Sequence, residues 1–238
     1  MKFFKKLLLL FVIICLIILI YLVFNGYIMY KNAINEKSIE TRVSELRNEN
    51  YYTSYEELPQ YYIDAVISVE DHRFYTHNGI DYLSVLRAII NNIRAGKPVE
   101  GGSSITQQLA KNLVFTQEKT IYRKIAELFA ARDLEKKYSK KEIFELYVNK
   151  MYFGNGYYNI HDASYGYYKK APKDLTLFEA TLLAGVPNAP SVYAPTVNLK
   201  LAEQRQRQVL SKMVEFGKLS QEEADNLISM QKTKWKKK

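Results

Sequence analysis

The chain is poor in cysteine, glycine and proline. Its 238 residues include one cysteine, Cys15, ten glycines and six prolines. A lone cysteine excludes an intrachain disulfide and a multi-cysteine zinc site, so a hydrophobic core must stabilise the fold. With 47% apolar and 25% charged residues, the composition excludes a collagenous or disordered chain, and the length suits one domain of the size of a typical catalytic domain.

Charge is absent from one long stretch near the N-terminus. Three lysines within the first six residues precede an uncharged run from Leu7 to Tyr30, and its first 18 residues are all apolar. A cleavable signal peptide usually has only about 7 to 15 apolar residues in its core. The lysines favour a cytoplasmic N-terminus. We therefore expect residues 1–30 to form a single-pass anchor in the cell (inner) membrane, with the catalytic domain on the extracytoplasmic side. A removed signal peptide is the alternative.

Basic residues outnumber acidic ones by 34 to 25, and five lysines lie within the last seven residues, 232–238. We interpret this basic tail either as a solvated segment or as one attracted to anionic membrane lipids. Nucleic acid is not an expected partner, because most of the chain is expected outside the cytoplasm.

Residues 31–54 are polar and predict a stalk, and residues 55–231 predict a folded domain. Helix-start signals dominate the domain: a capping-box pattern of Ser or Thr followed three residues later by Glu or Gln occurs at Ser54, Ser104, Ser139 and Thr176. Gly96 and Gly185, each two residues before a proline, predict left-handed helix ends. Since no run alternates with a period of two, we predict an all-α (mainly α) fold.

A first candidate segment spans residues 70–81. Ile63, Val66 and Ile67 recur at helical spacing and Glu70 follows on the same stripe, so its carboxylate should lie at the edge of a buried face. Burial disfavours the anion, which would make Glu70 a usable proton acceptor near neutral pH. The alternative is a structural ion pair with Arg73.

The histidines of this segment predict no metal site. The spacing of His72 and His77 fits no strong zinc pattern, and no third ligand is evident in the sequence. We expect these side chains to stabilise the loop through hydrogen bonds.

Two further segments carry polar and basic side chains. The glycine pair at 101–102 precedes a capped helix start at Ser104, whose free amides favour anions; a Walker loop is excluded, because the Gly-Lys-Ser/Thr element is missing. An ordinary capped helix is the alternative.

Farther along the chain, Arg123 and Lys124 lie one helical turn from Glu127. This could be a surface salt bridge, but Lys111 and Lys119 are close in sequence, and together these cations could bind a pyrophosphate.

Four blocks, in order and spacing, resemble the signature motifs of the peptidoglycan glycosyltransferases (glycosyltransferase family 51, the transglycosylase domain of class A penicillin-binding proteins). The blocks are Glu70-Asp71-x-x-Phe74-x-x-His77-x-Gly79-x-Asp81, Gly102-Ser103-Ser104-Ile105-Thr106-Gln107-Gln108, Arg123-Lys124-x-x-Glu127, and 141–149 followed by 152–156. The resemblance covers roughly residues 55–195. It implies a lysozyme-like helical domain beside the bilayer that polymerises lipid II into glycan strands.

The resemblance also implies roles for single residues. Glu70 would deprotonate the 4-hydroxyl of the acceptor GlcNAc, which displaces undecaprenyl pyrophosphate from the growing chain with inversion to a β-1,4 linkage, and Glu127 would be the second essential carboxylate. The implied substrate-binding residues are Asp71, Phe74, His77, Ser104, Thr106, Gln107, Gln108, Lys111, Lys119, Arg123, Lys124 and Asn149. No cofactor is implied, and a Mg or Mn ion at the pyrophosphate stays open. The implied partners are lipid II, the nascent strand and membrane lipids, with other cell-wall synthesis or division proteins left open.

Two rival functions remain: a muramidase-type glycan hydrolase and a non-catalytic membrane scaffold for cell-wall synthesis. The cation cluster favours the transferase, because cleavage of a neutral glycan does not need it. Relatives in this family often carry a transpeptidase domain with a Ser-x-x-Lys motif. Ser229-Met230-Gln231-Lys232 has that form near the C-terminus, which we interpret as coincidence, and we predict a monofunctional enzyme.

Overall fold

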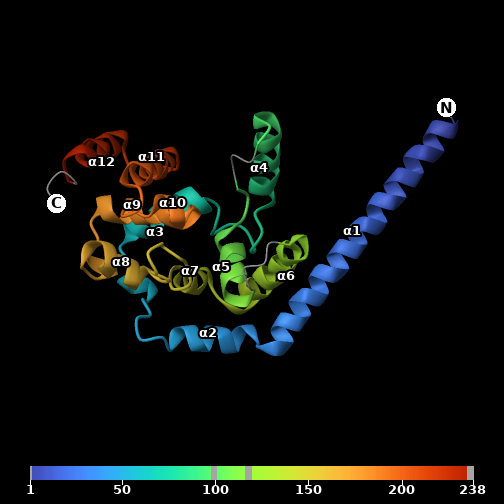
Figure 1. Cartoon of the computed structure of the whole chain (residues 1–238), viewed down its shortest axis with the longest axis horizontal. Coiled ribbons are helices and arrows are strands. Elements are labelled where there is room, and N and C mark those ends of the chain that lie inside the picture. Colours follow the sequence, from blue (N-terminus) through green and yellow to red (C-terminus); the bar gives the residue numbers. More distant parts are fainter. Residues whose placement is uncertain (1, 98–100, 116–119, 235–238) are drawn as a thin grey trace.

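The computed structural model describes residues 2–97, 101–115 and 120–234, and within these ranges the regular structure is entirely helical. One long helix extends from a compact group of shorter ones (Figure 1). The elements are α1 (Lys2–Glu36), α2 (Ile39–Arg47), η1 (Tyr55–Glu57), α3 (Gln60–Glu70), α4 (Tyr82–Ala95), α5 (Ile105–Val114), α6 (Ile121–Lys137), α7 (Lys140–Val148), α8 (Ile160–Tyr168), η2 (Pro172–Asp174), α9 (Leu177–Gly185), η3 (Val186–Asn188), α10 (Pro190–Tyr193), α11 (Leu199–Glu215) and α12 (Gln221–Lys234). The prediction of an all-α fold is confirmed.

Helix α1 has two dissimilar halves. Side chains from Phe3 to Ile20 are exposed, whereas Gly26 and Tyr30 are buried against the rest of the protein. By length and composition, α1 could cross a membrane, a property that it shares with signal sequences. The exposed apolar half is thus the segment that needs a non-aqueous environment.

Residues 31–54, where we expected a stalk, include the end of α1 and all of α2. Ser38 caps α2 by accepting a hydrogen bond from the amide of Thr41. Ile39, Val43 and Leu46 of this helix are buried in the main core, where α2 lies against α5. This segment therefore packs as part of the helical body.

The helix-start signals predict the local structure well. All four capping boxes form, although Ser54 begins only the 3-10 turn η1. Gly96 ends α4 in the left-handed conformation (φ 64°), as predicted, and Pro98 after it lies outside the described residues. The same prediction is wrong for Gly185, whose φ is −82°. A Cβ at Gly185 would lie only 2.8 Å from Cγ of Arg205, so this glycine makes room for α11.

The core forms where helices distant in sequence meet. Helix α3 packs against α9 and α11, and α5 packs against α6 and α7. Tyr62 of α3 and Phe144 and Tyr147 of α7 are among the largest fully buried side chains. This packing brings the C-terminal end of α3, the N-terminal part of α5 and the middle of α11 around one cleft.

Candidate active site

A cleft of about 1140 Å³ lies between α3, α4, α5 and α11. Of the residues implied by the sequence, those that line it are Glu70, Asp71, Ser104, Gln108 and Lys111. Helix α11 adds polar and charged side chains that the sequence reasoning missed, at Arg205, Gln208, Lys212 and Glu215. The cleft is therefore polar and carries both signs of charge.

Glu70 is the last residue of α3, and its side chain is 8% exposed. Its Oε1 lies 3.1 Å from Nη2 of Arg205, and its Oε2 accepts a hydrogen bond of 2.9 Å from Nε2 of Gln108. The alternative of an ion pair with Arg73 is wrong, because Arg73 pairs with Asp81. These two contacts hold the carboxylate of Glu70 in one orientation at the wall of the cleft.

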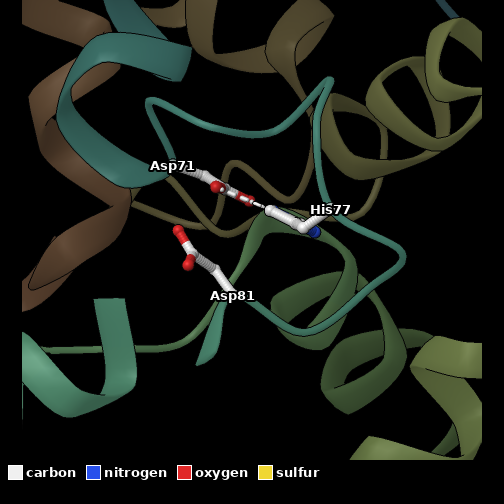
Figure 2. A group of neighbouring side chains, drawn as sticks. All are labelled: Asp71, His77 and Asp81. Atoms are coloured by element: carbon white, nitrogen blue, oxygen red, sulfur yellow. Dashed lines mark hydrogen bonds and ion pairs between the residues drawn. The ribbon is translucent and has the colours of Figure 1, made fainter. Parts of the chain in front are cut away.

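Asp71 and His77 stabilise the loop after α3, as expected for the histidine. Nε2 of His77 lies 2.9 Å from both carboxylate oxygens of Asp71, and the amide of Ile105 donates to Asp71 Oδ2 over 3.0 Å. Figure 2 shows the two side chains pointing toward one another, with the Asp81 carboxylate close to Asp71. Asp71 thereby connects this loop to the first turn of α5.

Asp81 completes this group and caps α4. Its Oδ1 accepts the Ser84 amide hydrogen bond over 3.0 Å. Burial raises the pKa of Asp81, but hydrogen bonds from Arg73 and Ser84 outweigh burial and hold that pKa well below its usual range. Asp71, His77 and Asp81 have ligand-type atoms within 4.8 Å of one another, so Asp81 is a third candidate metal ligand that the sequence reasoning did not identify. Both carboxylates are already engaged by protein hydrogen bonds.

Glu127 lies on α6 and is 1% exposed. Its Oε1 is 3.1 Å from Nε of Arg123, and its Oε2 is 2.9 Å from Nζ of Lys124. Nζ of Lys124 also donates to Oγ of Ser103 over 2.7 Å, and Ser103 lines the cleft. The predicted charge cluster on one face of α6 is therefore present.

Lys111 connects this cluster to the cleft. Burial lowers the pKa of Lys111, and the negative charges of Glu127 and Glu70 partly offset that effect. Its ammonium thus lies within the electrostatic influence of both carboxylates. Lys119, which was expected to add a further cation, lies outside the described residues.

Four other implied residues do not line the cleft. Phe74 is fully buried in the core, and Oγ1 of Thr106 donates to Glu135 over 2.6 Å. Gln107 completes the capping box of α5. Asn149 is the C-cap residue of α7 and donates from Nδ2 to the Thr53 and Glu145 carbonyls.

Ser104, by contrast, lines the cleft. It caps α5 and also donates a hydrogen bond of 2.5 Å to the Gly79 carbonyl.

The partner of Glu70 is the main feature that the sequence reasoning missed. Arg205 is 135 positions away along the chain. No spacing rule connects such distant positions, and the one local signal, Gly185, was interpreted as a helix end. In the folded protein, Gly185 instead allows α9 and α11 to pack closely beside Arg205.

Comparison with known proteins identifies the family. Residues 35–214 match the sequence model of the Transglycosylase family. Penicillin-binding protein 1F of Bacillus subtilis (strain 168) is 47% identical over 171 residues, which are 72% of this chain and 24% of that protein. Penicillin-binding protein 1A of Aquifex aeolicus is 42% identical, and the match covers 75% of this chain and 25% of that protein. The chain thus spans about a quarter of the length of these two relatives.

A shorter relative matches over most of its length. A Cupriavidus necator protein that carries the name transglycosylase is 41% identical over 177 residues, which are 74% of this chain and 76% of that protein. The crystal structure of penicillin-binding protein 1A from Haemophilus influenzae is 31% identical and covers 52% of this chain and 15% of that one, with a TM-score of 0.36. From the family match and the Cupriavidus relative, this chain belongs to the transglycosylase family of peptidoglycan-synthesising glycosyltransferases.

Proposed function

We propose that this chain polymerises lipid II by transferring the growing glycan strand from undecaprenyl pyrophosphate to the 4-hydroxyl of the acceptor GlcNAc. The observation that supports the proposal is that Glu70 and Lys111 line the same cleft. Lys111 is also close enough to the Glu127 cluster to feel its charges. A proton acceptor and cations for a diphosphate are thus brought into one site.

In this mechanism, Glu70 is the general base. Its carboxylate accepts the proton of the acceptor 4-hydroxyl while that oxygen forms a bond to the anomeric carbon of the donor. The bond from that carbon to the pyrophosphate oxygen breaks on the opposite face, so the configuration inverts to a β-1,4 linkage. Arg205 and Gln108 orient the carboxylate, which supports a single direction of attack.

The leaving group departs with two phosphates and their negative charge. Lys111 lines the cleft, and Arg123 and Lys124 lie around Glu127 beside it. We assign these cations to the pyrophosphate, because charges held in fixed positions stabilise developing charge without reorganising. Glu127 would hold the two α6 cations in position. This arrangement needs no dedicated metal ligand, and a divalent ion at the pyrophosphate stays open.

We also propose a membrane location, with residues 1–30 as a single-pass anchor and residues 55–231 as the catalytic domain outside the cytoplasm. Two exposed apolar surfaces support it. One is the first half of α1. The other is on α4, where the exposed aliphatic side chains are Leu83, Leu86, Ile89, Ile90 and Ile93. Helix α4 rises from the body on the side toward which α1 extends (Figure 1), which suits a lipid-linked substrate.

The decisive experiment gives the purified protein lipid II and measures the glycan strands formed. We expect wild type to polymerise, and Glu70→Gln to reduce the rate by about 10² to 10⁴-fold. A matched control is Asp64→Asn, which alters another α3 carboxylate, one that pairs with Lys218 instead of lining the cleft. This control should retain wild-type activity.

Thermal unfolding should show that all three proteins are folded. Full polymerisation by folded Glu70→Gln would refute its role as the base. Cleavage of glycan by wild type, without strand synthesis, would favour the muramidase-type hydrolase, and no reaction with either substrate would favour a scaffold.

A further inference from the structure

The second half of α1 is docked along α6. Its buried and half-buried positions recur every three or four residues, at Leu22, Gly26, Tyr30 and Ala33. The contact at Gly26 is close: an added Cβ would lie 2.5 Å from Cγ2 of Ile125. One turn later, Tyr30 donates a hydrogen bond to Asp133 and its ring lies 5.8 Å from that of Phe129. The anchor helix is thus packed against α6 over several turns.

Helix α6 uses a different face for the candidate site. The side chains that meet α1 are spaced three or four residues apart, at Tyr122, Ile125, Phe129 and Asp133. Arg123, Lys124 and Glu127 form the ion pairs described above, and Lys124 reaches Ser103 at the cleft. Because one helix carries both sets of contacts, the position of the cation cluster relative to α1 is set by this packing.

The apolar run of α1 has nearly the length of a bilayer core. From Leu7, the first residue after the N-terminal lysines, to Phe24 there are 17 helical steps, which correspond to about 26 Å, while the hydrocarbon core of a bilayer is about 30 Å thick. The first contact with α6 comes at the end of this stretch, where the rings of Tyr21 and Tyr122 lie 6.4 Å apart. The N-terminus of α6 is therefore placed where the hydrocarbon ends and lipid phosphates begin, with Arg123 and Lys124 in its first turn.

We propose that the packing of α1 on α6 sets the depth of the cation cluster, holding Arg123 and Lys124 at the level of the phosphates of a lipid-linked substrate. Gly26 and Tyr30 are then positioning residues, which act through α6 and do not touch the substrate. The inference rests on the proposed function, because only a substrate anchored in the same bilayer has its diphosphate at a defined depth. An enzyme for a soluble substrate would gain nothing from it.

The test compares Gly26→Leu with the control Ile28→Leu, which places leucine on the exposed side of the same turn. Each is assayed with lipid II in phosphatidylglycerol vesicles and in detergent micelles, which impose no fixed bilayer plane. In vesicles, we expect Gly26→Leu to lose about tenfold or more in kcat/KM, mainly through KM, since small displacements of a binding group are costly. In micelles it should match wild type, and Ile28→Leu should match it in both.

A second measurement reports depth without activity. Ile121 is exposed at the start of α6, so Ile121→Cys in a Cys15→Ser background offers one site for a fluorescent label. Quenching by lipids that carry nitroxides at different chain positions should place the label at the interface. Adding Gly26→Leu should change that depth. Combining Gly26→Leu with Ile125→Gly, which moves the small residue to the other helix, should restore both depth and activity in part.

These outcomes separate the inference from the proposed function. If wild type makes no glycan in either medium, the proposed function fails, while the depth measurement still tests the packing. If wild type is active and Gly26→Leu loses equally in vesicles and micelles, or loses nothing, or leaves the label depth unchanged, depth setting is refuted.

Discussion

The two carboxylates of the site, Glu70 and Glu127, are held in opposite ways. Glu127 pairs with Arg123 and Lys124 of its own helix, which are four and three residues away, respectively. Glu70 pairs with Arg205, which comes from another helix near the other end of the chain. Glu70 lines the cleft, whereas Glu127 is 1% exposed and connects to the cleft through its neighbours.

The two arrangements suit different chemical roles. A cluster within one helix keeps its geometry as long as that helix persists, which suits a fixed set of charges for a diphosphate. A carboxylate at the junction of α3 and α11 depends on tertiary packing, and it can be aimed at a reacting atom from a direction that no single helix offers. Substitutions that break each pairing should therefore have different signatures.

The largest effect on stability is expected at Glu127. The change Glu127→Gln removes the negative charge that Arg123 and Lys124 share, and breaking a buried ion pair costs about 3 kcal/mol or more in free energy of unfolding. Glycan synthesis should fall with it, because the cations lose their fixed positions. Urea unfolding measures the first effect and the lipid II assay the second. Unchanged stability would contradict the view that this cluster is a structural unit.

A smaller loss of stability, together with a loss of catalysis, is expected from Arg205→Met, which leaves the Glu70 carboxylate without its cation. Loss of a charge-assisted hydrogen bond costs about 1.5 to 3 kcal/mol, which corresponds to roughly a 10- to 100-fold lower kcat. Arg205→Lys should restore part of the rate, since it retains the charge but not the planar geometry. KM and kcat are measured separately. A change in KM alone would indicate that Arg205 binds substrate instead of orienting Glu70.

The smallest expected effect is a shift in pH dependence at Lys111. Burial lowers the pKa of its ammonium, despite the opposing influence of Glu127, so Lys111 should become neutral at a lower pH than an ordinary lysine. Activity that requires the cation must then fall on the alkaline side as pH rises. Lys111→Arg keeps its charge through that range and should move the alkaline limb of kcat/KM upward.

The control for this shift is Lys37→Arg, in an exposed ion pair with Glu45 far along the chain from the site. Its pH profile should coincide with that of wild type. If the alkaline limb of Lys111→Arg also coincides with wild type, another group controls it.

Local signals predicted much of the fold, while side-chain partners were predicted only at short range. The capping boxes at Ser104, Ser139 and Thr176 depend on four consecutive residues, and all formed. Gly185 looked like another local signal, but its role is to admit Arg205 of α11. A pattern that has both a local and a packing explanation cannot be resolved until the packing partner is known.

The helical class, the apolar N-terminal helix and the α6 charge cluster could be predicted from the sequence, because each depends on composition, periodicity or spacing within a few turns. The family could be predicted because four short motifs resemble those of known members. The pairing of Arg205 with Glu70, the positions of Phe74 and Asn149 away from the cleft and the packing of α1 along α6 could not. These contacts join residues far apart in the chain, and their geometry arises from the close packing of whole helices, which no local pattern records.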